Sequence, residues 1–195
     1  MKVLLQAAFV VLALLVGIAG AKDKNKNKNK NDNSQLHAKL VGSQEVPVVA
    51  TGATGEFRGV INPGDQSIDF VLTYSGLQGP VTQQAHIHVG QRSVNGGIVI
   101  WFCQSASNPG PAGTPNCTNG SGTFSGTITA ANVVAIGGAN VGQQISAGEL
   151  AKVLAAIRAG NAYANVHTNL STGGEIRGQI KVNGKDDDDD DEDED

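Results

Sequence analysis

Gly55-Glu56-Phe57-Arg58-Gly59-Val60-Ile61 is the first of three copies of one pattern, Gly-x-apolar-x-Gly-x-Ile. The other copies are residues 122–128 (GTFSGTI) and residues 174–180 (GEIRGQI). Apolar and polar residues alternate in each copy, as they do in a strand with one buried face. The central glycine lies on the apolar face, where it lets another backbone approach closely or a barrel strand bend. The repeat therefore predicts three strands of a closed or two-sheet β structure.

The segments between the repeats predict further strands and one helix. Strands are expected at residues 35–40, 68–74, 85–89, 98–102 and 163–168. Asn62-Pro63-Gly64-Asp65 is a tight-turn signal, which predicts a hairpin between the strands on either side. A helix with one apolar stripe is expected from a capping box at Ser146 and Glu149 to an end at Gly160. The expected fold is mainly all-β, a Greek-key-like sandwich or barrel with one short helix packed at one end.

The two ends of the chain differ in composition from its middle. Residues 1–21 have the order of a secretory signal peptide with its cleavage site; an uncleaved N-terminal anchor is the alternative. Residues 22–33 are a Lys/Asn tract without a large apolar residue, which predicts a disordered linker. Residues 186–195 are all acidic and repel one another, which predicts a disordered tail. Residues 34–185 remain as one β-domain of ordinary size.

This organisation predicts a protein that is secreted to the extracellular space or the periplasm. The domain has eight basic and six acidic residues, a balance too mild to indicate nucleic-acid binding. No apolar run after the signal is long enough to span a membrane. The acidic tail is expected to aid solubility, with diffuse calcium binding or attachment to a cationic surface or matrix as alternatives.

Cys103 and Cys117 are the only cysteines. An even pair in an exported chain predicts a disulfide, which here closes a loop rich in Pro, Gly and Asn. A metal site on these two residues is the alternative, but the chain has no Cys-x-x-Cys to support it.

Three histidines fall in predicted strands and are the main candidates for chemistry. His86 and His88 are two residues apart, so on a strand both imidazoles project to one face while Ala85 and Ile87 point into the core. The same alternation places His167 on the polar side of its own strand. We therefore expect all three on the outer, polar face of a sheet, sharing one site if their strands are neighbours. This pattern predicts a copper or zinc site; a metal-free polar cluster held by hydrogen bonds is the alternative.

Four other polar residues are expected around the histidines: Glu45, Asn165, Glu175 and Arg177. Glu175 and Arg177 share a strand face, either as an exposed ion pair or as partners of metal-bound imidazoles. His37, close to the entry of the domain, is the weakest candidate ligand. The chain has neither a Gly-x-Ser-x-Gly elbow nor a phosphate-binding glycine loop, so no catalytic residue is assigned.

These motifs together resemble the CHRD domain, which is named for chordin, an extracellular antagonist of growth-factor signalling. The resemblance is carried by residues 45–47 (EVP), 85–90 (AHIHVG), 163–168 (YANVHT) and 174–179 (GEIRGQ). It extends from Leu36 to Val182 and implies an extracellular β-domain, which also occurs singly in secreted microbial proteins. The chain lacks the cysteine-rich growth-factor-binding modules of chordin, so the resemblance does not imply growth-factor antagonism.

A second resemblance links the His-x-His-x-Gly at residues 86–90 and the Gly-x-Ile-x-Gly repeats to Cu/Zn superoxide dismutases, which are Greek-key β-barrels. It implies that His86, His88 and His167 are copper ligands. The chain has no separate zinc-ligand loop of His and Asp and no clear counterpart of the active-site arginine. The resemblance therefore does not imply dismutase activity, since function belongs to sites rather than folds.

The first hypothesis is accordingly a secreted, non-enzymatic CHRD module that binds an extracellular ligand or surface or has a structural role. The second is a copper- or zinc-binding protein, with redox activity as an option. The third is tail-mediated association with a matrix or with calcium.

Overall fold

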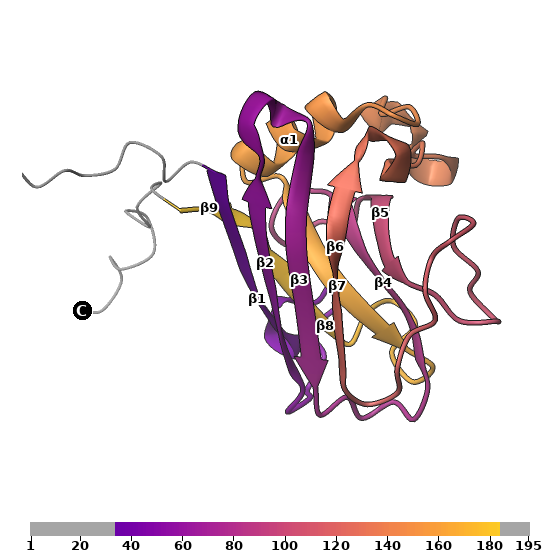
Figure 1. The fold of residues 1–195 in the computed structure, drawn as a ribbon. Helices are drawn as coiled ribbons and strands as arrows, with labels where there is room; N and C mark the ends of the chain where they lie inside the picture. Colours follow the sequence, from indigo (N-terminus) through magenta and orange to yellow (C-terminus); the bar gives the residue numbers. More distant parts are fainter. Residues whose placement is uncertain (1–33, 184–195) are drawn as a thin grey trace, which may run out of the picture.

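The computed structural model describes residues 34–183, so the predicted signal peptide (1–21), linker (22–33) and acidic tail (186–195) lie outside the described residues. The strands of the described part are β1 (Gln35–Val41), β2 (Thr54–Ile61), β3 (Ser67–Ser75), β4 (Thr82–Val89), β5 (Gly97–Cys103), β6 (Gly122–Thr129), β7 (Ala162–Thr168), β8 (Ile176–Gln179) and β9 (Lys181–Val182). They form one antiparallel sheet in the order β5-β4-β7-β8-β1-β2-β3-β6, with β9 paired to β1. β5 and β6, at the two ends of this order, contact each other, so the sheet curls into a nearly closed barrel (Figure 1). The prediction of a mainly all-β barrel with one short helix is confirmed.

The three repeat copies contribute β2, β6 and β8. β2 and β3 form the predicted hairpin and pair along their whole length, joined by a turn in which Gly64 has a φ of +79°. In the third copy the strand begins only after Glu175. Gly178 in β8 lies so close to β1 that a Cβ there would overlap the carbonyl oxygen of Lys39. At this position the repeat glycine does allow the close backbone approach that the pattern predicted.

Alternating side chains fill the interior of the barrel. In β1, Leu36 and Leu40 are buried while intervening polar residues point outward. Phe102 of β5 contacts Phe57 of β2 and Phe70 of β3, with ring centroids 5.6 and 4.9 Å apart. Aromatic packing therefore joins strands that lie far apart in the sheet order, which stabilises the closed form.

The helix α1 (Leu150–Arg158) lies at one end of the barrel (Figure 1). The residues of its apolar stripe are buried. Glu149 accepts a hydrogen bond from the Ser146 backbone N–H at 2.7 Å, which is half of the predicted capping box. The helix nevertheless begins at Leu150 rather than directly after Ser146, because Gly148 has a φ of +84° that interrupts helical backbone. Gly160, with a φ of +73°, follows the end of the helix as predicted.

The connections between strands contain short 3-10 segments, η2 (Gly42–Gln44), η3 (Pro63–Asp65), η4 (Ala130–Asn132) and η5 (Gly138–Gln143). Cys103 and Cys117 form the predicted disulfide, which closes the loop that follows β5. Between residues 34 and 183 no helix has the length and apolar character needed to cross a membrane.

The sheet face that carries the histidines is covered, which corrects the expectation of an outer, polar face. All residues of β7 and β8 are buried. The Gln179 side chain donates to the Gly90 carbonyl at 2.9 Å, and Asn95 donates to the Val46 carbonyl at 3.0 Å. The connections after β1 and β4 thus fold over this part of the barrel. Strand alternation predicted on which side of the sheet the histidines lie. It did not predict that other segments cover that side, because those segments are distant in sequence.

Candidate metal centre

His86, His88 and His167 lie together on one face of the neighbouring strands β4 and β7. His86 is paired with Asn165 and His88 with Tyr163, so His167 lies two residues further along the same face. The His86 ring centroid is 5.2 Å from that of His88 and 4.8 Å from that of His167. Each imidazole offers one ring nitrogen as a ligand atom, and these three nitrogens all lie within 4.8 Å of one another. The structure therefore brings the three imidazoles to one place.

Aromatic side chains close this cluster off from solvent. His86 is fully buried, and His88 and His167 are 7 % and 5 % exposed. The Trp101 indole of β5 packs edge-on against His86 with centroids 4.4 Å apart, and the Tyr163 ring stacks on His88 at 4.7 Å. These contacts fix the imidazole planes and exclude water from both rings.

Backbone carbonyl groups set the tautomers of two rings. The Nδ1 atom of His88 lies 2.9 Å from the Gly96 carbonyl oxygen, and Nδ1 of His167 lies 2.9 Å from that of Thr172. A carbonyl oxygen only accepts, so each Nδ1 carries the proton and each Nε2 has a free lone pair. Both of these Nε2 atoms, and both ring nitrogens of His86, are buried without a hydrogen-bond partner in the described part of the chain.

Burial keeps the three imidazoles neutral. The pKa of His88 is lowered to about 4 and that of His167 to about 4, in both cases mainly because the buried charged form loses its solvation. Burial also lowers the pKa of His86 well below 6.5, and the neighbouring His167 and His88 lower it further. At neutral pH all three rings are therefore in the form that binds a metal ion.

The spacing of the three nitrogens is close to that of a metal site. A metal bonded to imidazole nitrogens at 2.0–2.1 Å holds any two of them no more than about 4 Å apart. The three nitrogens here lie within 4.8 Å of one another, so their separations exceed this limit by no more than about 0.8 Å. Three neutral imidazoles are a donor set that suits copper or zinc.

Arg177 holds the segment that covers His88. Its guanidinium carbon lies 3.4 Å from the centre of the Tyr163 ring, and that ring stacks on His88. The Nη2 group donates to the carbonyl oxygens of Gln91 and Val94, both at 3.0 Å. Arg177 therefore supports the cluster through Tyr163 and through the loop that follows β4.

Glu175 forms hydrogen bonds with residues other than the three histidines. Its carboxylate accepts the backbone N–H groups of Gln78 and Gly79 and the hydroxyl groups of Thr51 and Thr168, at 2.7 to 3.1 Å. Burial alone would raise the pKa of Glu175, but these four donors lower it on balance. Within the described residues no hydrogen bond joins Glu175 to the three histidines. It ties the end of β7 to the loop after β3, and it reaches His167 only through the two neighbours of that residue: the Thr168 hydroxyl donates to the Glu175 carboxylate, and the Glu175 backbone N–H donates to the Val166 carbonyl at 2.8 Å.

Glu45 and Asn165 are both buried on the histidine side of the sheet. Burial raises the pKa of Glu45 to about 7, although the positive charge of Arg177 opposes the shift. A Cβ on Gly174 would overlap the Glu45 carboxylate, so this acid occupies space that only glycine leaves free. The Oδ1 atom of Asn165 makes no hydrogen bond within the described residues and lies opposite His86 on the neighbouring strand.

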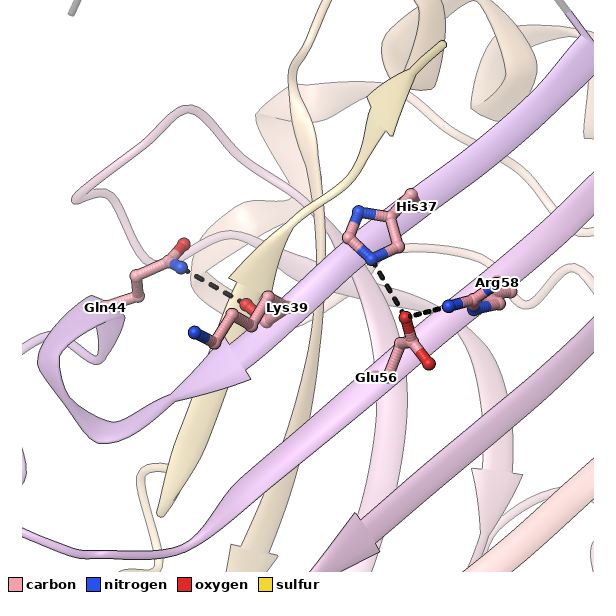
Figure 2. A network of polar contacts seen from close by, with 5 residues as sticks. All are labelled: His37, Lys39, Gln44, Glu56 and Arg58. Carbon is pink, nitrogen blue, oxygen red and sulfur yellow. Dashed lines mark hydrogen bonds and ion pairs between the residues drawn. The ribbon is translucent and has the colours of Figure 1, made fainter.

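His37 does not join the cluster. It is half-exposed on β1, where its Nε2 atom lies 3.1 Å from the Glu56 carboxylate, which also pairs with Arg58 at 2.8 Å (Figure 2). Beside it, Gln44 donates to the Lys39 carbonyl at 3.2 Å. His37 is thus a surface residue with a carboxylate partner and provides a matched control for the other three histidines.

Sequence reasoning did not find Trp101 or Gly96, although both contact the cluster. Trp101 lies in a strand that was predicted, but its contact with His86 depends on how β5 pairs with β4. Gly96 supplies the acceptor for His88 through its backbone, which no side-chain pattern reveals.

A nearly closed antiparallel barrel with a buried histidine cluster defines a small β module. Its family is established by comparison: the chain belongs to the CHRD domain family, whose model matches residues 36–180. This confirms the CHRD resemblance seen in the sequence. No curated protein and no solved structure matches the chain.

Proposed function

We propose that this chain is an exported, non-enzymatic CHRD module that binds one copper or zinc ion through His86, His88 and His167. CHRD domains are typically extracellular, which agrees with the signal peptide expected at residues 1–21. The observation that carries the proposal is the set of buried ring nitrogens that have no hydrogen-bond partner in the described part of the chain.

Unpaired buried nitrogens are costly, and one metal ion would satisfy three of these four, one on each ring. A buried polar group without a partner costs about 1–3 kcal/mol, and proteins pair nearly all such groups. One ion accepts a lone pair from each of the three rings. A metal-free polar cluster would instead need hydrogen bonds between the rings, to the Asn165 side chain beside His86 and His88, or to Glu175, whose carboxylate already has four other donors.

Because the cluster is buried, it is better suited to holding a metal ion than to catalysing a reaction. A catalytic metal keeps an open position for water or substrate. Here Trp101 and Tyr163 pack on the rings of His86 and His88 and leave little surface for a substrate to reach. Retention, delivery or structural use of the ion fits this geometry better.

Trp101 offers a direct test, because it is the only tryptophan of the chain and lies against His86. Copper or zinc would be titrated into the purified full chain while tryptophan fluorescence is recorded, and bound metal would be counted by elemental analysis. We expect saturation at one tightly bound ion for the wild type and for His37→Gln, and loss of this site in His88→Gln. Equal binding by wild type and His88→Gln, or no tight binding by either, would overturn the proposal.

Residues 186–195 favour a second, independent function, which is diffuse calcium binding or attachment to a cationic matrix. Ten adjacent carboxylates provide hard oxygen ligands, but their sequence has neither the turn glycine nor the spacer residues of an EF-hand calcium loop. Deletion of residues 186–195 is expected to abolish calcium binding measured by calorimetry. Unchanged binding after deletion would rule this function out.

A further inference from the structure

We infer that the histidine site takes monovalent copper in preference to divalent zinc or divalent copper. The inference rests on the metal site proposed above and specifies the charge of its occupant. Imidazole nitrogen alone does not discriminate among these ions. The charge balance, the burial and the coordination number of the site discriminate among the three ions.

The ligand set supplies no negative charge. His86, His88 and His167 are neutral donors, and within the described residues no acidic side chain joins them in a group that could hold a metal. Glu175 is occupied by backbone and hydroxyl donors, and Glu45 faces the positive charge of Arg177. The charge of a bound ion therefore remains uncompensated by its ligands.

The free-energy cost of burying an uncompensated ion rises with the square of the charge of the ion. The idealised cost of moving an ion from water into a low-dielectric interior is about fourfold larger for a double charge than for a single one. The cost is increased by the Arg177 guanidinium, which lies on the Tyr163 ring that stacks on His88. A site of this composition penalises a divalent ion much more than a monovalent one.

The coordination number of the site also favours monovalent copper. Zinc bound by three protein ligands usually keeps a water molecule as the fourth. The aromatic rings of Trp101 and Tyr163 pack on the histidines, and the three imidazoles are almost completely buried. Monovalent copper has a filled d shell and is satisfied by three nitrogen donors, so it needs no water in this closed space.

The preference can be measured on the unmodified full chain. Cu⁺ affinity would be determined anaerobically by competition with bicinchoninate, and Zn²⁺ and Cu²⁺ affinities by competition with chelators of known strength. We expect Cu⁺ to bind at least about a thousandfold more tightly than Zn²⁺. If Zn²⁺ binds as tightly as Cu⁺, the inference fails while the metal site stands. If none of the ions binds at the histidines, the metal site itself fails.

A charge change beside the site tests the reason for the preference. Asn165 lies opposite His86 on the neighbouring strand and is buried, so Asn165→Asp brings a carboxylate to the cluster. The ratio of Zn²⁺ to Cu⁺ affinity is expected to rise at least about tenfold. Asn116→Asp adds the same charge at an exposed position and should leave the ratio unchanged. Equal ratios in both variants would show that charge does not set the selectivity.

Discussion

Tyr163 and His88 face each other across β7 and β4 with ring planes 3° from parallel and centroids 4.7 Å apart. The Tyr163 hydroxyl also accepts the Gly96 N–H at 3.3 Å, while the Gly96 carbonyl accepts Nδ1–H of His88 at 2.9 Å. Tyr163 and Gly96 thus hold the imidazole from its face and from its edge. This leaves Nε2 as the one free position of His88, which is the arrangement that a metal ligand requires.

Removal of the Tyr163 ring should therefore weaken metal binding without removing a ligand. In Tyr163→Leu, His88 loses its stacked partner, and metal affinity is expected to fall about tenfold or more, the usual effect of residues that orient a ligand. Tyr163→Phe keeps the stack and loses only the long hydrogen bond from Gly96, so its affinity should stay within about threefold of wild type. Competition with a chelator measures both. Equal losses in the two variants would show that stacking does not position His88.

Arg177 should control the loop that covers the site. Arg177→Met removes the hydrogen bonds to Gln91 and Val94, so amide hydrogen exchange at residues 91–95 is expected to accelerate. The loss should cost about 2–4 kcal/mol in the free energy of unfolding, because two hydrogen bonds from a charged donor are removed. Arg58→Met, at an exposed position of β2 away from this loop, is the control. Unchanged exchange in Arg177→Met would contradict the role given to Arg177.

The stability of the metal-free protein should depend on pH with a definite sign. The pKa values of His88 and His167 are about 4 in the folded state, so between pH 6.5 and 4 the unfolded chain binds protons that the folded chain does not. The free energy of unfolding therefore falls as pH drops through this window, by up to about 3 kcal/mol for each imidazole. Urea denaturation at several pH values measures the fall.

Glu45 contributes with the opposite sign. Its pKa is raised to about 7 by burial, so its stabilising contribution is present below pH 4.5 and is lost as pH rises through 7. Glu45→Gln removes this term and should expose the histidine effect alone, as a steeper loss of stability between pH 6.5 and 4.5. A Glu45→Gln variant with constant stability across that window would contradict the assigned burial of the imidazoles.

Gly174 should be intolerant of a side chain for two separable reasons. Its φ of +127° disfavours any other residue, and a Cβ would overlap the Glu45 carboxylate. Gly174→Ala is therefore expected to destabilise the fold by about 2 kcal/mol or more. In a double-mutant cycle with Glu45→Ala the steric part should disappear and the backbone part should remain. Additive effects would show that Glu45 and Gly174 do not touch.

Much of the fold was predictable because the local patterns agree with the tertiary structure. The period-2 alternation gave the strands, and Gly64 and Gly160 marked a turn and a helix end through their left-handed backbone. The pairing of β4 with β7 could not be read from the sequence. It follows from contacts between segments about 80 residues apart, which no local signal encodes.

The grouping of the three histidines was predictable, but the surroundings of the group were not. The spacing of His86 and His88 placed both rings on one face, and alternation placed His167 on the same side. The sequence gives no sign that Trp101, Tyr163 and the loop after β4 enclose them. Burial determines their protonation, and we infer the charge of the favoured ion from the same burial, which the sequence alone does not reveal.

X-ray absorption on the copper-loaded protein tests the central claim most directly, because it reports which atoms bind the ion. Three nitrogen neighbours at about 2.0 Å, with the scattering pattern of imidazole rings, are expected for binding at His86, His88 and His167. The same spectrum should persist in His37→Gln and disappear in His88→Gln. A first shell of oxygen alone, as the acidic tail would provide, would contradict the account.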